Sequence, residues 1–133
     1  MTDGIDHIGI ATNSLDDHSQ FWSSLGFIQR KDEVNVEQGV KIRFFEAISG
    51  GPKIELLEPI TPDSPIGKFL DKRGEGVQQI AVKTMDILST ISQLKSMGIR
   101  MINDEPVGGA NGTKIAFVHP SSTGGVLVEL VEH

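Results

Sequence analysis

The chain has 133 residues, with 12 Lys and Arg against 18 Asp and Glu, and therefore a net charge of −6 at pH 7 with neutral histidines. This length predicts one domain, or two half-size modules that share a core, and the acidic balance argues against a nucleic-acid partner, whose phosphates need a basic surface. Because cysteine is absent, disulfides, thiolate metal sites and cysteine nucleophiles are excluded.

The hydropathy pattern gives no sign of a membrane partner. No apolar run reaches the roughly 20 residues that span a bilayer, and residues 1–13 have neither the basic start nor the uninterrupted apolar segment of a signal peptide. Hydrophobic residues make up 38% and charged residues 23% of the chain, which is typical of a globular domain in water. We therefore expect a cytoplasmic protein.

The first half of the chain predicts a strand, a helix and three further strands. Alternating β-branched residues predict a strand over residues 5–11. Ser14 is placed to cap a helix that continues to Ser24, and Gly26 is placed to end it. Turn residues separate the three strands that follow, which are expected over residues 27–32, 40–48 and 53–58.

The second half predicts the same order after a proline-rich linker. A short helix is expected over residues 64–72, within that linker. The cluster of Gly108, Gly109 and Gly112 predicts a flexible loop. The other elements are a strand over residues 77–83, a helix over 86–97, and strands near Arg100, over 114–118 and over 126–131.

The two halves are similar enough to be copies of one unit of about 72 residues. DHIGI aligns with QQIAV and LGF with MGI at an offset of 72, KIRFF aligns with KIAFV at 73, and GGPKIELLE aligns with GGVLVELVE at 74. Four matches in the same order predict an α+β fold in which paired βαβββ modules, at about residues 4–60 and 76–132, curl around a cleft. The two modules are expected to form a single domain over residues 1–133.

Four polar residues occupy matching positions in the two copies: His7 and Gln79 in the opening strands, and Glu55 and Glu129 in the closing strands. A single glutamate of this kind could simply face solvent on a half-exposed strand. A carboxylate on an interior face needs a partner, and all four residues offer nitrogen or oxygen donors. As a repeated set they suit a divalent ion such as Co²⁺, Mn²⁺, Ni²⁺ or Zn²⁺.

Six segments carry a resemblance to a known family: DHIGIA, KIELLEP, DSPIGKFL, GEGVQQIAV, FVHP and the final GGVLVEL. Over essentially the whole chain they resemble methylmalonyl-CoA epimerases of the vicinal oxygen chelate (glyoxalase/bleomycin resistance) superfamily. The resemblance implies a metal-dependent enzyme that interconverts (2R)- and (2S)-methylmalonyl-CoA by removing the α-proton through a metal-stabilised enolate. It also implies an acyl-CoA substrate and a homodimer.

The resemblance assigns roles to individual residues. It implies that His7, Glu55, Gln79 and Glu129 are the metal ligands, and that Glu129 and Glu37 are the acid–base groups on the two faces of the enolate. The chain departs from the family at Gln79, where epimerases carry a ligand histidine.

Two other functions stay open for a chain with this pattern. One is a glyoxalase I-like lactoylglutathione lyase, whose ligands often combine one Gln with His and two Glu. The other is a non-enzymatic small-molecule-binding protein of the bleomycin-resistance type.

The basic residues give the weakest functional signal in the sequence. Five of them are candidates for contacts with CoA phosphates: Lys41, Arg43, Lys68, Lys72 and Arg73. Scattered surface cations are usually only solvated, and the chain contains no Walker-type or dinucleotide-binding glycine motif. The sequence therefore leaves the CoA-binding residues open.

Overall fold

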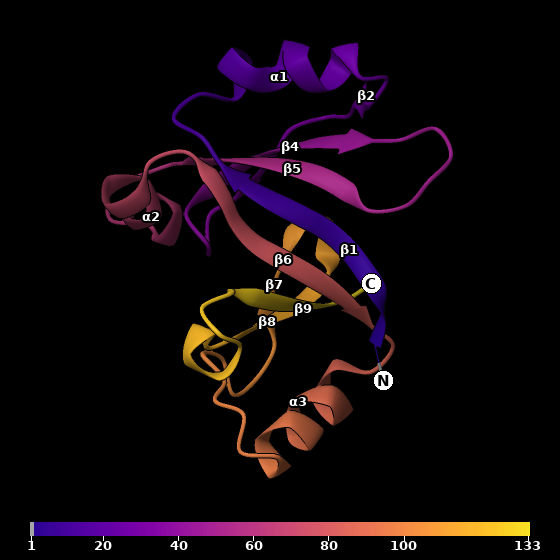
Figure 1. The fold of residues 1–133 in the computed structure, drawn as a ribbon, viewed down its shortest axis with the longest axis vertical. Coiled ribbons are helices and arrows are strands. Elements are labelled where there is room, and N and C mark those ends of the chain that lie inside the picture. The colour runs from indigo at the N-terminus through magenta and orange to yellow at the C-terminus, as the bar shows by residue number, and fades with distance from the viewer. Residues whose placement is uncertain (1) are drawn as a thin grey trace. The chain divides into compact units, whose positions relative to one another are not determined.

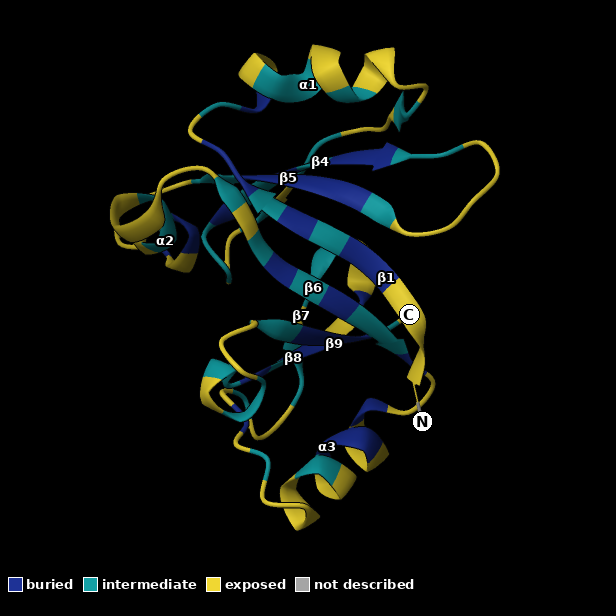
Figure 2. Cartoon of the chain, in the orientation of Figure 1, coloured by how far each residue is buried: buried dark blue, intermediate teal, exposed yellow. Residues whose placement is uncertain are grey.

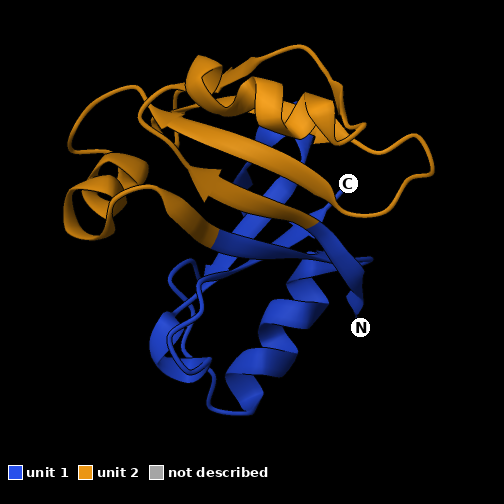
Figure 3. Ribbon diagram, turned by 45° about the horizontal axis from the view of Figure 1, so that its top comes forward, with its two compact units in different colours: residues 1–6, 79–133 blue, residues 7–78 orange. Residues whose placement is uncertain are grey.

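The computed structural model describes residues 2–133 and divides into two compact units (Figure 3). The N-terminal unit is His7–Gln78, and the C-terminal unit combines the residues up to Asp6 with Gln79–His133. Each unit contains an opening strand, a helix and further strands, so the predicted α+β class with paired βαβββ modules is confirmed. The single-domain organisation stays a prediction.

The sheet of the N-terminal unit is built around its closing strand. β5 (Lys53–Pro59) pairs in parallel with β1 (Thr2–Ala11) and antiparallel with β4 (Val40–Glu46). Two short strands, β2 (Ile28–Gln29) and β3 (Glu33–Asn35), pair antiparallel with β4. The parallel β1–β5 pair places the opening and closing strands of this module side by side.

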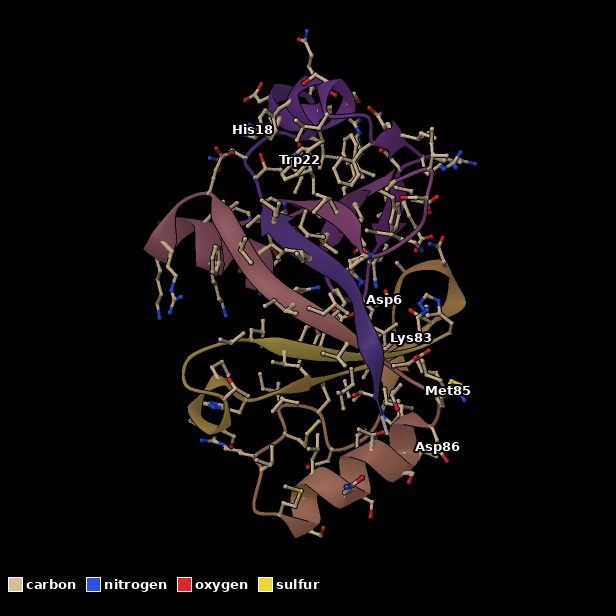
Figure 4. The ribbon with its side chains drawn as sticks, turned by 45° about the vertical axis from the view of Figure 1, so that its right-hand side comes forward. Asp6, His18, Trp22, Lys83, Met85 and Asp86 are labelled. Atoms are coloured by element: carbon tan, nitrogen blue, oxygen red, sulfur yellow. The ribbon has the colours of Figure 1, made fainter. Side chains whose placement is uncertain are left out.

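One face of this sheet is covered by α1 (Leu15–Ser24), which lies over β4 and β5 in Figure 1. The buried residues beneath the helix are Leu15, Phe45, Ile54 and Leu56. Trp22 points from α1 toward them in Figure 4 and packs against this cluster. The outer surface of α1 is exposed (Figure 2), so the helix is held mainly by its inner face.

The C-terminal unit repeats this plan. β9 (Val128–Glu132) pairs in parallel with β6 (Gly76–Thr84) and antiparallel with β8 (Lys114–Val118), and the short β7 (Val107–Gly108) pairs with β8. α3 (Ile87–Ser96) packs on one face through a buried cluster that also contains strand residues. The members of that cluster are Ile87, Ile91, Met101, Ala116, Val118 and Leu130.

The helix over residues 64–72 is also present, as α2 (Pro65–Arg73). Short 3₁₀ turns occur at Ala110–Gly112 and Pro120–Ser122. Among the described residues, no helix is both long enough and apolar enough to cross a bilayer.

The two module helices begin with the same long-range contact. The side chain of Ser14 occupies the cap position of α1 but makes no capping hydrogen bond. The Leu15 amide instead donates to Glu58 Oε1 at 3.0 Å, and the Ile87 amide of α3 donates to Glu132 Oε1 at 2.9 Å. The two glutamates are separated by the repeat offset of 74 residues, so each closing strand caps the helix of its own module.

Several short elements differ from the sequence prediction. β3 was not predicted, and β7 lies where the glycine cluster predicted only a loop. The strand expected near Arg100 is reduced to one isolated bridge between Met101 and Val118. These strands span two or three residues and are set by backbone pairing to a neighbour, which leaves no periodic pattern in the sequence.

Candidate metal centre

The N-terminal unit brings His7 and Glu55 together on adjacent strands. In the parallel β1–β5 pairing Gly9 lies opposite Glu55, so His7 is its diagonal neighbour. His7 Nδ1 is 3.1 Å from Glu55 Oε2, and the two residues are only 4% and 6% exposed. Ile54 and Leu56, on either side of Glu55, belong to the cluster beneath α1, so alternation directs Glu55 to the opposite face of the sheet.

The C-terminal unit brings Gln79 and Glu129 together in the same register. Ala81 lies opposite Glu129 in the parallel β6–β9 pairing, and Gln79 is again the diagonal neighbour. Gln79 Nε2 donates to Glu129 Oε1 at 2.7 Å, and the two residues are 7% and 5% exposed. Val128 and Leu130 pack with α3. The sequence prediction that each copy carries a matched polar pair is therefore confirmed for each unit by itself.

The burial of both glutamates excludes the alternative that they face solvent on half-exposed strands. Neither Glu55 nor Glu129 faces solvent, so the interpretation as exposed strand residues is wrong. Each unit thus holds one carboxylate beside one imidazole or amide in a buried position. Imidazole, amide oxygen and carboxylate are donors that hard to borderline divalent ions accept, so the residues present fit such an ion.

The pKa of Glu129 is shifted well away from its usual value. Burial raises the pKa of its carboxyl to about 8, with a smaller contribution from the negative charge of Asp6 and an opposing one from the hydrogen bond with Gln79. A carboxyl group whose pKa lies near neutrality can both hold and release a proton under physiological conditions.

Asp6 is a buried carboxylate that the sequence analysis missed. It precedes His7 on β1 and is labelled on that strand in Figure 4. His133 Nε2 lies 2.6 Å from Asp6 Oδ1. Asp6, His7 and Glu55 each offer a ligand atom, and these atoms lie within 4.8 Å of one another. This buried cluster is consistent with a metal site. Strict strand alternation predicts that Asp6 and His7 face opposite sides of the sheet. The sequence analysis therefore did not include Asp6 among the candidate ligands.

Glu37 lies apart from any strand. It is an exposed residue of the turn between β3 and β4. The turn is closed by a hydrogen bond from the Gly39 amide to the Val36 carbonyl at 3.1 Å and by one from the Gln38 amide to Asn35 Oδ1, also at 3.1 Å. The role that the resemblance implies for Glu37 stays a prediction.

Arg43, one of the candidate phosphate contacts, forms ion pairs with two aspartates of the same unit. Its guanidinium binds both carboxylate oxygens of Asp32, each at 2.8 Å, and Asp16 Oδ1 at 2.7 Å. This pairing lowers the pKa of Asp32 and raises the pKa of Arg43, each first of all through their shared hydrogen bonds. Arg43 therefore ties α1 to the sheet.

The sequence and the fold agree on a family. Residues 6–117 match the family described as the Glyoxalase/Bleomycin resistance protein/Dioxygenase superfamily. The chain belongs to this superfamily.

Several relatives within the superfamily are similar over nearly their full length. The uncharacterized protein YqjC of Bacillus subtilis is 43% identical over 96% of this chain and 91% of its own. The structure of methylmalonyl-CoA epimerase from Mycobacterium tuberculosis has 37% identity and a TM-score of 0.94, covering 98% of this chain and 88% of that one. A variant of Streptomyces coelicolor methylmalonyl-CoA epimerase, in complex with 2-nitronate-propionyl-CoA, has 41% identity and a TM-score of 0.91, covering 99% and 98%. This superfamily member is thus related to methylmalonyl-CoA epimerases.

Proposed function

We propose that the protein is a metal-dependent epimerase that interconverts (2R)- and (2S)-methylmalonyl-CoA. The observation that carries the proposal is Glu129, a buried carboxyl on the closing strand of a module that accepts a hydrogen bond from Gln79 at 2.7 Å. Similarity to methylmalonyl-CoA epimerases over nearly the whole chain supports the choice of substrate.

The metal site of this proposal consists of His7, Glu55, Gln79 and Glu129. Each unit contributes one neutral donor and one carboxylate, and all four residues are buried. A bound Co²⁺, Mn²⁺, Ni²⁺ or Zn²⁺ ion would supply Lewis-acid stabilisation of the negative charge that develops on the thioester oxygen.

The proton transfer falls to two carboxyl groups in this proposal. Glu129 removes the α-proton from one face of the substrate, and the electron pair of the broken C–H bond delocalises into the thioester carbonyl to give a planar enolate. Glu37 delivers a proton to the other face, and reversal of the two roles runs the reaction backward. The burial of Glu129 suits it to this exchange because a carboxylate held away from water is a stronger base than an exposed one.

The test is hydrogen exchange at the substrate α-carbon. The protein is stripped of metal, reloaded with each of the four ions in turn and incubated with (2R)-methylmalonyl-CoA in D₂O. We expect uptake of one deuterium at the α-carbon and formation of the (2S) epimer, both lost in Glu129→Gln and kept in Glu105→Gln, which alters an exposed carboxylate. Absence of exchange with every ion would overturn the proposal.

A glyoxalase I-like lyase is the second candidate, because Gln79 brings an amide into the donor set. The same metal-loaded preparations are therefore assayed with the hemithioacetal of methylglyoxal and glutathione. Turnover of this compound without α-proton exchange on methylmalonyl-CoA would favour the lyase.

A further inference from the structure

The register of each sheet places a phenylalanine opposite the buried glutamate of that module. In the antiparallel β4–β5 pairing Phe44 lies opposite Glu55, and in the antiparallel β8–β9 pairing Phe117 lies opposite Glu129. Residues that face each other across such a pair point to the same side of the sheet, with Cβ atoms about 4.5–5.5 Å apart. Each glutamate therefore has an aromatic side chain as a neighbour on its own face.

The two phenylalanines differ in their exposure. Phe44 is only 5% exposed, so the protein encloses its ring. Phe117 is half-buried, and part of its side chain is therefore accessible to a ligand. The accessible ring is the one beside Glu129, the residue to which the proposed function gives the removal of the α-proton.

Phe117 belongs to an apolar surface of the C-terminal unit. Its neighbours in sequence, Ala116 and Val118, belong to the cluster beneath α3, so alternation places Phe117 on the other face of the sheet, together with Glu129. On that face it packs against a second buried cluster, which consists of Ala81, Ile115 and Val131. The ring thus has apolar support on one side and the carboxyl of Glu129 close by.

The backbone of Phe117 brings its side chain close to Glu129. Its amide donates to Asn103 Oδ1 at 2.9 Å, and its carbonyl oxygen accepts from the Ile102 amide at 2.8 Å. Because both backbone groups are used on the side away from β9, Phe117 and Glu129 form a non-hydrogen-bonded pair. In such a pair the two side chains lie closer together than in a hydrogen-bonded pair.

The α-carbon of the substrate in the proposed reaction carries four groups. Its proton faces Glu129, and its thioester and carboxylate groups carry the oxygen atoms that suit the polar residues of the site. The fourth group is the methyl group, which lies in the plane of the enolate and at right angles to the C–H bond that breaks. It therefore extends sideways from Glu129, where an apolar side chain on the same face is its natural contact.

We propose that Phe117 contacts the α-substituent of the substrate and limits its length. The ring covers a methyl group, and it cannot move aside for a longer chain, because its backbone is fixed by hydrogen bonds and its other side is packed against a buried cluster. The proposal rests on the proposed function in taking the ligand to be a malonyl thioester with an alkyl group at its α-carbon. It does not require that the site transfers a proton.

The test is a comparison of four CoA thioesters that differ only at the α-carbon. Malonyl-, methylmalonyl-, ethylmalonyl- and butylmalonyl-CoA are titrated into the metal-loaded protein by calorimetry. We expect the methyl group to lower the Kd by about fourfold relative to malonyl-CoA, as burial of one methyl group does. The butyl group should raise the Kd by about tenfold relative to methylmalonyl-CoA, because the ring blocks its path.

Two substitutions should change these Kd ratios in opposite directions. Phe117→Ala removes the ring, so the advantage of the methyl group should disappear and the penalty on the butyl group should fall by about tenfold. Phe117→Trp places a larger ring at the same position, so the ethyl and butyl compounds should bind more weakly than they bind to the wild type.

Two further variants control for the loss of packing. Phe117→Leu removes less side-chain volume; it should shift the ratios in the same direction as Phe117→Ala and carries the test if the alanine variant does not fold. Phe27→Ala is the matched control, because Phe27 packs against the cluster beneath α1, and its ratios should equal those of the wild type. Equal ratios in the wild type and the Phe117 variants, or an equal shift in Phe27→Ala, would overturn the proposal.

Exchange of the α-proton in D₂O separates this inference from the proposed reaction. Kd ratios that depend on Phe117, without exchange in any of the four thioesters, would support the role of Phe117 and overturn the epimerase. Exchange in methylmalonyl-CoA, with Kd ratios that the Phe117 variants do not change, would have the opposite result.

Discussion

A carboxyl group removed from water resists ionisation, as Glu129 shows. Its pKa rises from the usual 4.5 to about 8, first because of burial and then because of the charge of Asp6. Its counterpart Glu55, at the matching position of the other module, has the imidazole of His7 as its neighbour instead of an amide. One substitution between the repeat copies therefore gives the two glutamates different surroundings.

In the metal-free protein, the raised pKa of Glu129 should make the free energy of unfolding depend on pH. Between pH 4.5 and about 8 the folded state keeps a proton on Glu129 that the unfolded chain has lost. The folded state therefore binds more protons, and the free energy of unfolding falls as the pH rises through this window. We expect a loss on the order of several kcal/mol in urea denaturation between pH 5 and 8, and a much flatter profile for Glu129→Gln. Glu105→Gln is the control, and an unchanged slope in Glu129→Gln would contradict the assignment.

Gln79 sets the metal preference in the proposed site. An amide oxygen is a harder and weaker donor than imidazole and needs no deprotonation. We expect Gln79→His to bind Co²⁺ and Zn²⁺ several times more tightly than the wild type, with affinity that falls below the usual histidine pKa of about 6.5. The visible d–d bands of Co²⁺ measure both titrations. A wild type that shows no bands, beside a variant that does, would mean that the natural chain is not a metalloenzyme.

At the scale of elements, the two module helices depend on strands far away in sequence. Glu58 and Glu132 accept from the first amides of α1 and α3, in place of the local serine cap that the sequence predicts for α1. A carboxylate at a helix N-terminus satisfies a free amide and meets the positive end of the helix dipole. Each contact thus joins a helix to the closing strand of its module.

Removal of these carboxylates should destabilise the protein. Glu58→Ala and Glu132→Ala are each expected to cost about 1 kcal/mol, as the loss of a helix cap does, measured by chemical denaturation at pH 7. Ser14→Ala should have a smaller effect, since its side chain makes no capping bond. A larger loss from Ser14→Ala than from Glu58→Ala would show that the serine is the true cap.

The elements that the sequence predicted well are those with a long repeated pattern. α1 and α3 lie where the sequence predicts helices over residues 14–24 and 86–97, and β8 has the predicted bounds of 114–118. The elements missed were β3 and β7, which bury few side chains and exist because a neighbouring strand supplies backbone partners. Pairing across a sheet is information that a local pattern does not contain.

At the scale of the molecule, the internal repeat predicted the candidate site better than any single motif. Alignment of the copies selected His7, Glu55, Gln79 and Glu129, and the structure places them as two buried diagonal pairs in one register. It did not select Asp6, because strand alternation predicts that Asp6 and His7 face opposite sides of the sheet.

The proposed single metal ion requires a contribution from both modules. Glu55→Ala and Glu129→Ala should therefore both lower the metal content of the purified protein, measured by elemental analysis. Their activities should differ, because Glu129 also transfers the proton: saturating metal should restore exchange in Glu55→Ala but not in Glu129→Ala. Equal and complete rescue of the two variants would remove Glu129 from the acid–base pair.

The long-range caps also constrain the order of events while the protein is being made. Leu15 and Glu58 are 43 residues apart, and Ile87 and Glu132 are 45 apart. On the ribosome, the Leu15 amide of α1 has no carboxylate partner until residue 58 has emerged. The start of α3 differs because it also has a local cap, in which Asp86 Oδ1 accepts a hydrogen bond from the Ser89 amide at 3.1 Å. We therefore expect α1 to stay frayed at its start during translation until its closing strand has been made, so that the first module becomes firm before the second has been synthesised.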